Sequence, residues 1–370
     1  MSEAPASWAR ADRLLCVRLD ALGDVLMTGP ALRALKHAHP GRHITLLTSP
    51  IGASIARYLP DVDDVLIYQA PWMKATPARA NSEADQAIVH RLRAKRFDGA
   101  VIFTVYSQSA LPAAHLCYLA DIPLRLAHCR ENPYQLLTDW IPECEPQPRL
   151  RHEVRRQLDL VRYTGAPPKG ERLELQLPPD CFDEARRKLS ALGVNPGARW
   201  VVVHPGASAP SRRYPAAGFA AAARALVQEH GCTVIFSGTA EESALIETIR
   251  GEMGAASHSL AGKLALGPLC GLIALAPVLI SNNTGPVHIA AAVDTPVVDL
   301  YALTNPQHMP WGVENRVLYH NVACKYCYKS LCPEGHHDCL RRVPPQAIVE
   351  AALELLALRA PARHLAGATE

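Results

Sequence analysis

Short apolar runs alternate with longer segments of helical periodicity along the chain, and this alternation predicts its architecture. An apolar run at residues 14–19, with an arginine inside it, leads through a loop at 20–24 into an apolar-periodic stretch that ends near Pro40. Residues 44–48 then return as a strand, so the chain opens with a β-α-β unit. The further strands expected in this half are residues 65–68 and 100–105.

A second series of strands follows a break in the pattern. After a helical stretch at 152–163, residues 165–179 are rich in proline and glycine and lack clear periodicity, which is typical of an interdomain linker. Alanine-rich helical segments then separate four predicted strands, at residues 200–204, 233–236, 278–281 and 296–300. Two successive β/α halves predict an α/β protein with two doubly wound parallel sheets, as domains 1–170 and 171–370.

Composition narrows the class of protein without changing this picture. At 370 residues, 49% hydrophobic and 20% charged, the chain is long enough for two cores and has no low-complexity tract. A net charge of +3 gives no general field for nucleic acid. The local basic run at 90–96 is interpreted as a solvated helix face, with attraction to anionic lipid or a phosphorylated acceptor as the alternative.

No part of the sequence has the pattern of a membrane-inserted segment. The first twelve residues lack the apolar stretch of a signal peptide, and no run reaches the eighteen or so apolar residues that a membrane span needs. The chain is therefore expected in the cytoplasm. At most, we expect peripheral contact at the inner face of the cytoplasmic membrane.

Ligands of doubly wound sheets bind beyond the carboxyl ends of the strands, and the loop after the first strand has unusual chemistry. Gly23 permits close backbone approach, and Asp24 stands where the next helix begins. One interpretation of Asp24 is an ordinary helix N-cap. The other is a carboxylate that takes a proton from an acceptor hydroxyl.

The loop at 204–215 follows a hydrophobic strand and combines a glycine, hydroxyls and adjacent arginines. Backbone amides and the Ser208 hydroxyl are suited to hold phosphate oxygens, while the Arg212 guanidinium would neutralise charge on a leaving diphosphate. The structural alternative is that Arg212 and Arg213 are simply solvated.

The loop at 281–292 is the most specific of the three. A buried strand runs directly into it, and Pro286 suits the first turn of a helix whose free amides form an anion site. Strand, hydroxyl-glycine turn at Thr284 and Gly285, and helix together describe a phosphate cradle. Capping alone would explain Thr284, and a satisfied core histidine would explain His288.

Two further segments complete the expected donor side. Glu241 follows the strand at 233–236, where a carboxylate can accept hydrogen bonds from ribose hydroxyls. Carboxylates in a first helical turn are also ordinary partners of the helix dipole. Residues 304–311 follow the last predicted strand and are expected to line the same pocket.

Three motifs in this order resemble glycosyltransferase family 9, typified by the ADP-heptose lipopolysaccharide heptosyltransferases. They are LDALGDVLMTGPALRALK, HPGASAPSRRYP and SNNTGPVHIAAAVDTPVVDLY, and the similarity spans about residues 14–340. The resemblance implies a GT-B fold, in which two doubly wound Rossmann-like domains face a cleft. It implies that the N-terminal domain binds the acceptor and the C-terminal domain binds the nucleotide sugar. It also implies inversion at the anomeric carbon, with no cofactor or metal for catalysis.

The resemblance also assigns roles to single residues. Asp24 matches the family's proposed base, with Gly23 beside it in the acceptor-side loop, and Arg212 falls where the family often has lysine. Many members have aspartate where this chain has Asn283, which leaves the preferred sugar and base open. The matched donor-binding residues are Ser208, Arg212, Glu241, Asn283, Thr284, Gly285 and His288.

The expected function is transfer of a heptose or a related sugar from an ADP-sugar to an acceptor hydroxyl, in the synthesis of lipopolysaccharide or another surface glycan. The acceptor is a glycan, a glycolipid or a protein. A protein or small-molecule glycosyltransferase of the same fold and a nucleotide-sugar epimerase are the enzyme alternatives. A non-catalytic nucleotide-sugar-binding module is the other class, and it would have no use for Asp24.

Four of the eleven cysteines crowd into residues 324–339. Their C-x2-C-x4-C-x6-C spacing can close four thiolates around a structural zinc or iron ion and leaves no open position for catalysis. Four reduced thiols are the alternative, with disulfides the weakest option in a reducing compartment. The other seven cysteines are scattered singly and are expected in the core. The predicted ligands are Cys324, Cys327, Cys332 and Cys339.

Overall fold

The structure, a computed structural model, describes residues 6–74, 76–195 and 197–359. The chain divides into two compact units, residues 1–176 and 177–370. The last residues of unit 1 are held by its helical layer. Arg33 Nη1 donates to the Arg172 carbonyl oxygen at 3.2 Å, and the Gln176 amide donates to the Tyr58 carbonyl oxygen at 2.8 Å. Leu173 between them is buried.

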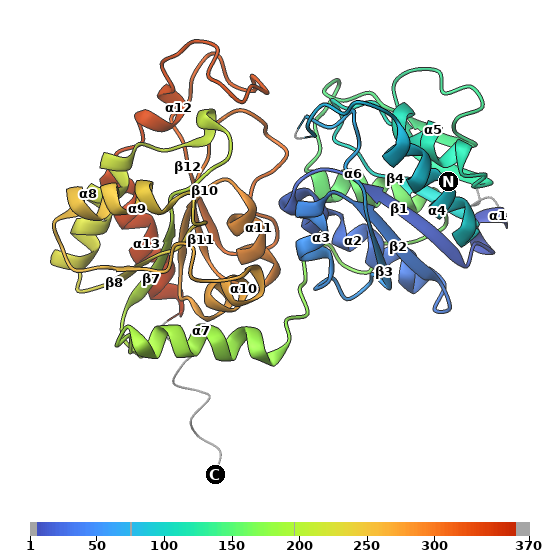
Figure 1. The fold of residues 1–370 in the computed structure, drawn as a ribbon. Coiled ribbons are helices and arrows are strands. Elements are labelled where there is room, and N and C mark those ends of the chain that lie inside the picture. Colours follow the sequence, from blue (N-terminus) through green and yellow to red (C-terminus); the bar gives the residue numbers. More distant parts are fainter. Residues whose placement is uncertain (1–5, 75, 196, 360–370) are drawn as a thin grey trace. The chain divides into compact units, whose positions relative to one another are not determined.

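Unit 1 is built on a parallel sheet, which within the described residues has six strands in the order β3-β2-β1-β4-β5-β6 (Figure 1). The order reverses between β1 and β4, so the carboxyl end of β1 lies at the switch point where such sheets bind ligands. The strands are β1 Arg13–Arg18, β2 His43–Thr48, β3 Asp64–Ile67, β4 Gly99–Ile102, β5 Leu124–Cys129 and β6 Asp139–Pro142. The helices are α1 Ala6–Ala9, α2 Leu22–Ala38, α3 Pro50–Ala56, α4 Glu83–Lys95, α5 Leu111–Leu119 and α6 Glu153–Arg162.

Unit 2 repeats this plan. Its sheet of six described parallel strands has the order β12-β11-β10-β7-β8-β9, which read from β9 is the order of unit 1 (Figure 1). The reversal now falls between β7 and β10. The strands are β7 Trp200–His204, β8 Thr233–Phe236, β9 His258–Ser259, β10 Leu279–Asn282, β11 Val297–Leu300 and β12 Asn315–Leu318. The helices are α7 Pro179–Ala191, α8 Ala216–Gln228, α9 Ser243–Met253, α10 Leu266–Leu275, α11 Gly285–Ala292, α12 Asp338–Arg341 and α13 Pro345–Arg359, with a 3-10 turn at Pro210–Arg212.

The predicted pair of doubly wound sheets is confirmed, and each strand expected from an apolar run is present. The strands that the pattern missed have weak apolar signals. β6 and β12 are only half-buried, and β9 has two residues. In β5, Arg125 and His128 interrupt the apolar run although both side chains are buried.

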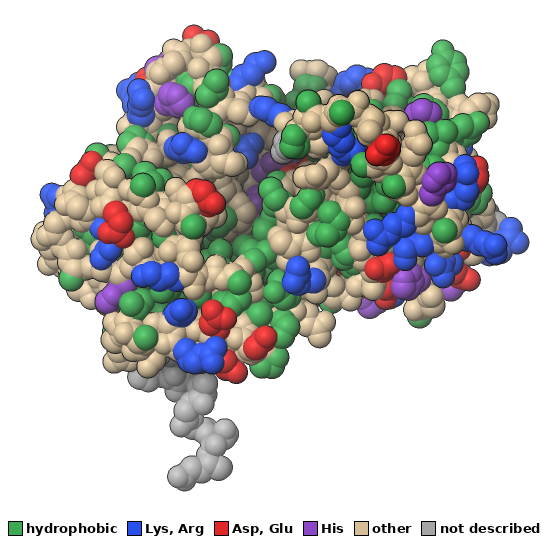
Figure 2. All heavy atoms as spheres, in the orientation of Figure 1, with side chains coloured by type: hydrophobic (Ala, Val, Ile, Leu, Met, Phe, Trp, Pro, Cys, Tyr) green, Lys and Arg blue, Asp and Glu red, His purple; other side chains and the backbone are tan. Residues whose placement is uncertain are grey.

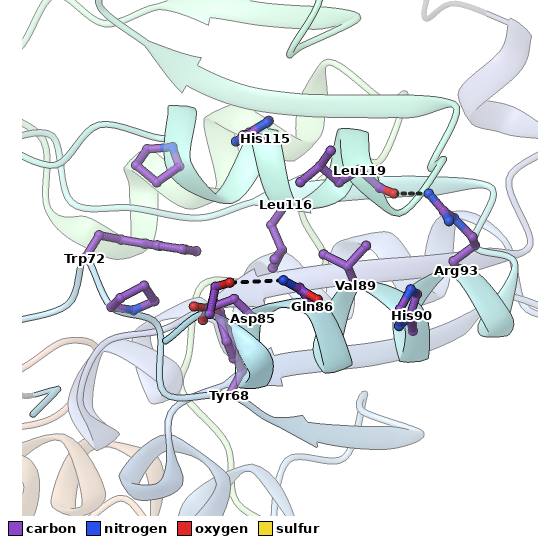
Figure 3. Close-up of a pocket in the computed structure, with 13 residues that line it drawn as sticks. Tyr68, Trp72, Asp85, Gln86, Val89, His90, Arg93, His115, Leu116 and Leu119 are labelled. Atoms are coloured by element: carbon purple, nitrogen blue, oxygen red, sulfur yellow. Dashed lines mark hydrogen bonds between the residues drawn. The ribbon is translucent and has the colours of Figure 1, made fainter. Parts of the chain in front are cut away.

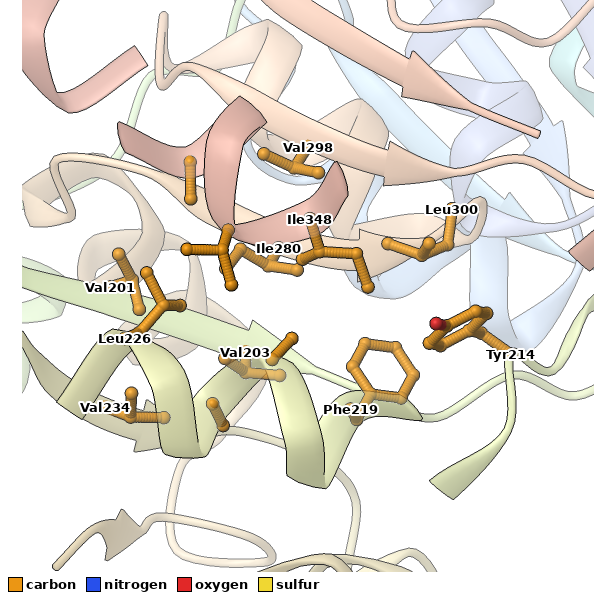
Figure 4. Close-up of a cluster of buried hydrophobic side chains, with 14 of the residues drawn as sticks. Val201, Val203, Tyr214, Phe219, Leu226, Val234, Ile280, Val298, Leu300 and Ile348 are labelled. Atoms are coloured by element: carbon orange, nitrogen blue, oxygen red, sulfur yellow. The ribbon is translucent and has the colours of Figure 1, made fainter. Parts of the chain in front are cut away.

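The core of unit 2 shows why its strands appear as continuous apolar runs: parallel strands covered by helices are buried on both faces. Val201 and Ile280, from β7 and β10, belong to the buried cluster that includes Phe219 of α8 (Figure 4). Tyr214 anchors the preceding loop in this core. Its ring meets Phe219 edge-on with 5.2 Å between centroids, and its hydroxyl donates to the Val343 carbonyl oxygen at 2.8 Å.

The seven cysteines outside residues 324–339 mostly follow the prediction that they lie in the core. Six of the seven are buried, but Cys144 is exposed, so the prediction of a core position was wrong there.

Charged side chains of both signs mix over the face shown in Figure 2, in keeping with the small net charge. Among the described residues, no helix is long and apolar enough to cross a bilayer.

Candidate functional site

A buried arginine gathers three carboxylates at the carboxyl end of β1. Arg18, the last residue of this strand, has a fully buried side chain. Its Nε lies 3.0 Å from Asp20 Oδ2, its Nη2 3.1 Å from Asp24 Oδ1 and its Nη1 2.9 Å from Glu153 Oε1. Gln108 Nε2 donates to Asp20 Oδ1 at 2.6 Å. We call these four charged residues the Arg18 cluster. With all of them ionised, three negative charges surround one positive charge.

The electrostatics of the Arg18 cluster reflect its burial and its paired charges. Burial raises the pKa of Asp20 to about 6 against the opposing charge of Arg18, and the Asp24 carboxylate adds to the rise. Although burial opposes its charge, the surrounding carboxylates hold the pKa of Arg18 above its usual range. The site therefore keeps a fixed cation and can take up protons near neutral pH.

Asp24 has a structural contact and an accessible carboxylate at the same time. It lies in the first turn of α2, and its Oδ2 accepts from the Ala21 amide at 3.1 Å, which closes the start of the helix. Its side chain is 17% exposed, whereas Glu153 is fully enclosed. Gly23 beside it is buried. Of the carboxylates paired with Arg18, Asp24 is the most open to a ligand.

In unit 2, one asparagine at the end of β10 forms hydrogen bonds with the loop after β7, across the switch point. Asn282, the last residue of β10, is fully buried. Its Nδ2 donates to the Pro205 carbonyl oxygen at 2.7 Å, and its Oδ1 accepts from the Tyr214 amide at 3.0 Å. The residues after β7 are thereby held against the end of β10. Sequence reasoning missed this role because it depends on two contacts that are 77 and 68 residues apart in sequence.

The predicted phosphate-binding side chains lie on these loops. Ser208 is exposed in the loop after β7. Arg212 is half-buried at the end of the 3-10 turn, and among the described residues its guanidinium has no hydrogen-bond or ion-pair partner. Neighbouring Arg213 is instead held, since its Nε donates to the Ala207 carbonyl oxygen at 2.7 Å. Of the two arginines, Arg212 has the guanidinium that is free to meet an anion.

The loop after β10 runs directly into α11. Thr284 stands at the N-cap position, but its side chain does not cap the helix, because Oγ1 donates to the Asn282 carbonyl oxygen at 3.2 Å. Gly285 begins the helix and is half-buried, and His288 one turn later is buried. The first-turn amides of α11 are therefore left without a side-chain cap in the described chain.

Of two adjacent glutamates after β8, the structure turns Glu242 and not Glu241 toward the β7 loop. Glu241 is exposed. Glu242 Oε2 accepts from the Thr239 amide at 2.8 Å and lies 3.7 Å from His204 Nε2. A Cβ added at Gly206 would overlap the Glu242 carboxylate, so that glycine is needed for close approach. The sequence offered no signal to separate the two glutamates.

Comparison with known proteins now decides the family. The model of "Glycosyltransferase family 9 (heptosyltransferase)" matches residues 86–337. The chain belongs to glycosyltransferase family 9. It is therefore a glycosyltransferase, and the predicted resemblance is confirmed. The matched range contains the unit 2 loops described above, whereas the Asp24 loop precedes it.

Individual family 9 relatives support the same conclusion over most of the chain. Lipopolysaccharide heptosyltransferase 2 of Salmonella typhimurium is 26% identical over 359 residues, covering 93% of this chain and 98% of that protein. Lipooligosaccharide heptosyltransferase 2 of Campylobacter jejuni is 31% identical over 169 residues, so the match spans 45% of this chain and half of that protein. The structure of Escherichia coli ADP-heptose lipopolysaccharide heptosyltransferase II has a TM-score of 0.72 at 23% identity, covering 94% of this chain and 99% of that one. This likeness shows the shared GT-B fold.

The cysteine-rich segment 324–339 of this family 9 enzyme forms hydrogen bonds with two strand-end loops of unit 2. The Tyr326 and Tyr328 amides donate to the carbonyl oxygens of Leu303 and Thr304 at 2.6 and 2.8 Å. Ser211 Oγ, in the 3-10 turn, donates to the Lys329 carbonyl oxygen at 2.8 Å. The segment thus connects the loop after β7 with the loop after β11.

The structure does not support the predicted zinc or iron centre in this segment. Cys324, Cys327, Cys332 and Cys339 are all free and partly exposed. Cys324 Sγ lies 3.6 Å from His336 Nε2. Among the described residues, no three or more His, Cys, Asp or Glu side chains are grouped so as to hold a metal ion.

A pocket of about 500 Å³ is lined by α4, α5 and the loop that follows β3 (Figure 3). Trp72, Val89 and Leu116 give it apolar walls, and Arg93 lies at one end. Arg93 belongs to the basic run at 90–96, and its Nε pairs with Asp121 Oδ2 at 2.6 Å. The lining contains no residue of the Arg18 cluster, so the pocket is separate from the candidate active site.

Proposed function

We propose that this family 9 enzyme transfers a heptose from ADP-heptose to a hydroxyl of a growing lipopolysaccharide or related surface glycan. The names of its relatives, lipopolysaccharide heptosyltransferase 2 and ADP-heptose lipopolysaccharide heptosyltransferase II, support this donor and this class of acceptor. The observation that carries the proposal is the accessible Asp24 carboxylate, oriented by a buried arginine at the switch point of unit 1. Transfer would take place in the cytoplasm or at the inner face of its membrane.

In the proposed reaction, the Asp24 carboxylate removes the proton of the acceptor hydroxyl. The hydroxyl oxygen forms a bond to the anomeric carbon of heptose as the bond from that carbon to the diphosphate oxygen breaks. A single displacement of this kind inverts the configuration at the anomeric carbon. The pair with Arg18 fixes the direction of the Asp24 carboxylate, and a fixed base lowers the entropic part of the barrier.

Unit 2 would bind the donor, with unit 1 binding the acceptor. Arg212, whose guanidinium is free in the described chain, is positioned to neutralise the departing diphosphate, with Ser208 in the same loop as a hydrogen-bond donor. The uncapped amides of α11 after Thr284 and Gly285 supply further donors for phosphate oxygens. His288 in the first turns of this helix remains a proposed contact. On the ribose side we propose that Glu242 supports the β7 loop, with direct contact by Glu241, as predicted from the sequence, the alternative.

The same side chains support transfer without a metal ion. A magnesium ion that assists diphosphate departure is usually held by one or two carboxylates together with the phosphates of the substrate. At the end of β10 this chain places Asn283, a neutral amide, and at the β7 loop it places Arg212. Charge on the leaving group would therefore be balanced by a guanidinium and backbone amides. We expect EDTA to leave turnover unchanged.

The decisive test is an Asp24→Asn variant of the full chain, assayed for ADP release from ADP-heptose in the presence of an acceptor extract. We expect turnover to fall by about 10³-fold, because general-base catalysis contributes about 10² to 10⁴. Binding of ADP should stay within about threefold of wild type. Asp121→Asn, at the exposed pair with Arg93, is the control and should retain full turnover.

Other outcomes of these assays would contradict the assigned base, the transferase function or the single displacement. Wild-type turnover by Asp24→Asn would remove the assigned base. Binding of ADP-heptose without acceptor-dependent ADP release in the wild type would favour a binding module, and conversion of a nucleotide sugar to its epimer would favour an epimerase. Retention of the donor's anomeric configuration in the product, read by proton NMR, would contradict a single displacement.

A further inference from the structure

Next to the proposed diphosphate loops, an asparagine amide and a buried carboxyl form a pair across two strands. Asn283 follows β10 directly and is 6% exposed, and Asp299 lies inside β11 with no exposed surface. Asn283 Nδ2 donates to Asp299 Oδ2 at 2.9 Å and to the His308 carbonyl oxygen at 3.0 Å. Both hydrogens of one amide nitrogen are thus used inside unit 2.

The second of these bonds fixes which way the amide points. A backbone carbonyl oxygen only accepts hydrogen bonds, so the atom of Asn283 that faces His308 must be the nitrogen. The side-chain oxygen, Oδ1, then points the other way. No described residue donates a hydrogen bond to this oxygen, and it is not among the fully enclosed polar atoms.

Asp299 brings little negative charge to this pair. In the described chain no cation forms an ion pair with it, and its Oδ1 has no hydrogen-bond partner. Burial raises the pKa of Asp299 to about 8, against the hydrogen bond from Asn283. A buried carboxyl without a cation is more stable in its neutral form. Asn283 is therefore held by a neutral partner.

The place of this pair in the fold gives it a ligand-facing role. Asn283 lies between Asn282, which holds the β7 loop, and Thr284, which precedes the free amides of α11. Resting on the proposed function, we propose that Asp299 is a positioning residue that turns the Asn283 amide so that its Oδ1 accepts a hydrogen bond from a hydroxyl of the donor sugar. The contact is to the glycosyl group and not to the nucleotide.

An uncharged acceptor is suited to this position. A carboxylate would also accept from a sugar hydroxyl, but it would place a negative charge next to the region proposed for the diphosphate. The amide oxygen gives the same hydrogen bond without that repulsion. Because an amide can rotate and exchange its oxygen for its nitrogen, it recognises a hydroxyl donor only when its nitrogen is held, and Asp299 and the His308 carbonyl hold it.

The test is calorimetric binding of ADP-heptose and of ADP to the full chain and to three variants. Asp299→Leu removes the acceptor for Nδ2, and Asn283→Leu removes Oδ1 itself. We expect each to weaken ADP-heptose binding by about tenfold, the value of one hydrogen bond, and to change ADP binding by less than twofold. Asp299→Asn keeps a side-chain oxygen for Nδ2 and should bind both ligands as the wild type does.

The double variant separates positioning from general destabilisation. If both residues act through one hydrogen bond to the sugar, combining Asn283→Leu with Asp299→Leu should cost no more than Asn283→Leu alone. Additive losses would overturn the proposal, as would equal losses for ADP and ADP-heptose, or unaltered ADP-heptose binding by Asp299→Leu. If a leucine variant fails to fold, Asn283→Ala and Asp299→Ala repeat the cycle with smaller side chains. If the wild type binds ADP-heptose but transfers nothing, the proposed function is overturned. The same binding measurements still test this inference in that case.

Discussion

The two units share one strand order, but the chemistry at their switch points is opposite. At the end of β1 in unit 1, a buried guanidinium holds three carboxylates. At the ends of β10 and β11 in unit 2, two asparagines and a carboxyl with a raised pKa make hydrogen bonds, and no described residue forms an ion pair with that carboxyl. The same fold therefore provides a ligand-binding position in each unit, and the side chains at that position determine its chemistry.

The difference fits the charge that each side of the proposed reaction must handle. A base has to attract a proton, and both burial and a neighbouring carboxylate raise the proton affinity of a carboxyl group, as the raised pKa of Asp20 illustrates. A diphosphate is itself an anion, and it is bound best where fixed negative charge is absent and amides and a guanidinium are present.

The largest effect is expected from Arg18→Met, which removes the only cation of the Arg18 cluster. Taking one partner from a buried ion pair leaves uncompensated charge and costs about 3 to 5 kcal/mol. We expect the free energy of unfolding in urea to fall by that amount and turnover to fall by at least about 10³-fold, because Asp24 loses its orientation.

The matched control for this variant is Arg93→Met. Arg93 also pairs with an aspartate, at 2.6 Å, but both side chains are more than half exposed. Exposed pairs contribute about 0 to 1 kcal/mol, so this variant should unfold and turn over nearly as the wild type does. Equal losses of stability from the two variants would show that burial does not set the strength of the Arg18 cluster.

A smaller effect, visible in the pH dependence of stability, is expected from Asp20. Its folded pKa of about 6 lies above the unfolded value of 3.8, so between these values the folded protein binds more protons than the unfolded chain. Stability should therefore fall as pH rises from about 4 to about 6, by up to about 3 kcal/mol. Asp20→Asn should remove this slope in urea titrations at pH 4, 5, 6 and 7. A variant as pH-dependent as the wild type would mean that another group carries the proton.

The sequence predicts the strand ends well and the contacts among them poorly. Apolar runs mark strands such as β7 and β10 because both faces of a parallel sheet are buried, and the loops that follow them must then lie at one edge. The partner of Arg18 could not be found in this way, since Glu153 is 135 residues away. A usable signal existed in both units: Arg18 and Asp299 are charged residues inside the apolar runs at 14–19 and 296–300.

The smallest effect concerns the choice between Glu241 and Glu242, two adjacent carboxylates that cannot be told apart by sequence. We expect Glu242→Ala to weaken ADP binding by about three- to tenfold, because it removes the acceptor of the Thr239 amide and the side chain that packs against Gly206. Glu241→Ala should change ADP binding by less than twofold, since Glu241 is exposed. Calorimetry with ADP measures both.

The pair of variants distinguishes two ways of organising the nucleotide side of unit 2. If Glu242 acts by supporting the β7 loop, Glu242→Gln should restore most of the binding, because a glutamine oxygen still accepts from the Thr239 amide and fills the same space. If a free carboxylate contacts ribose directly, Glu241→Ala should give the larger loss and Glu242→Ala the smaller. That second result would place a negative charge at the nucleotide, and the contrast between a charged unit 1 site and a neutral unit 2 site would then hold only around the diphosphate.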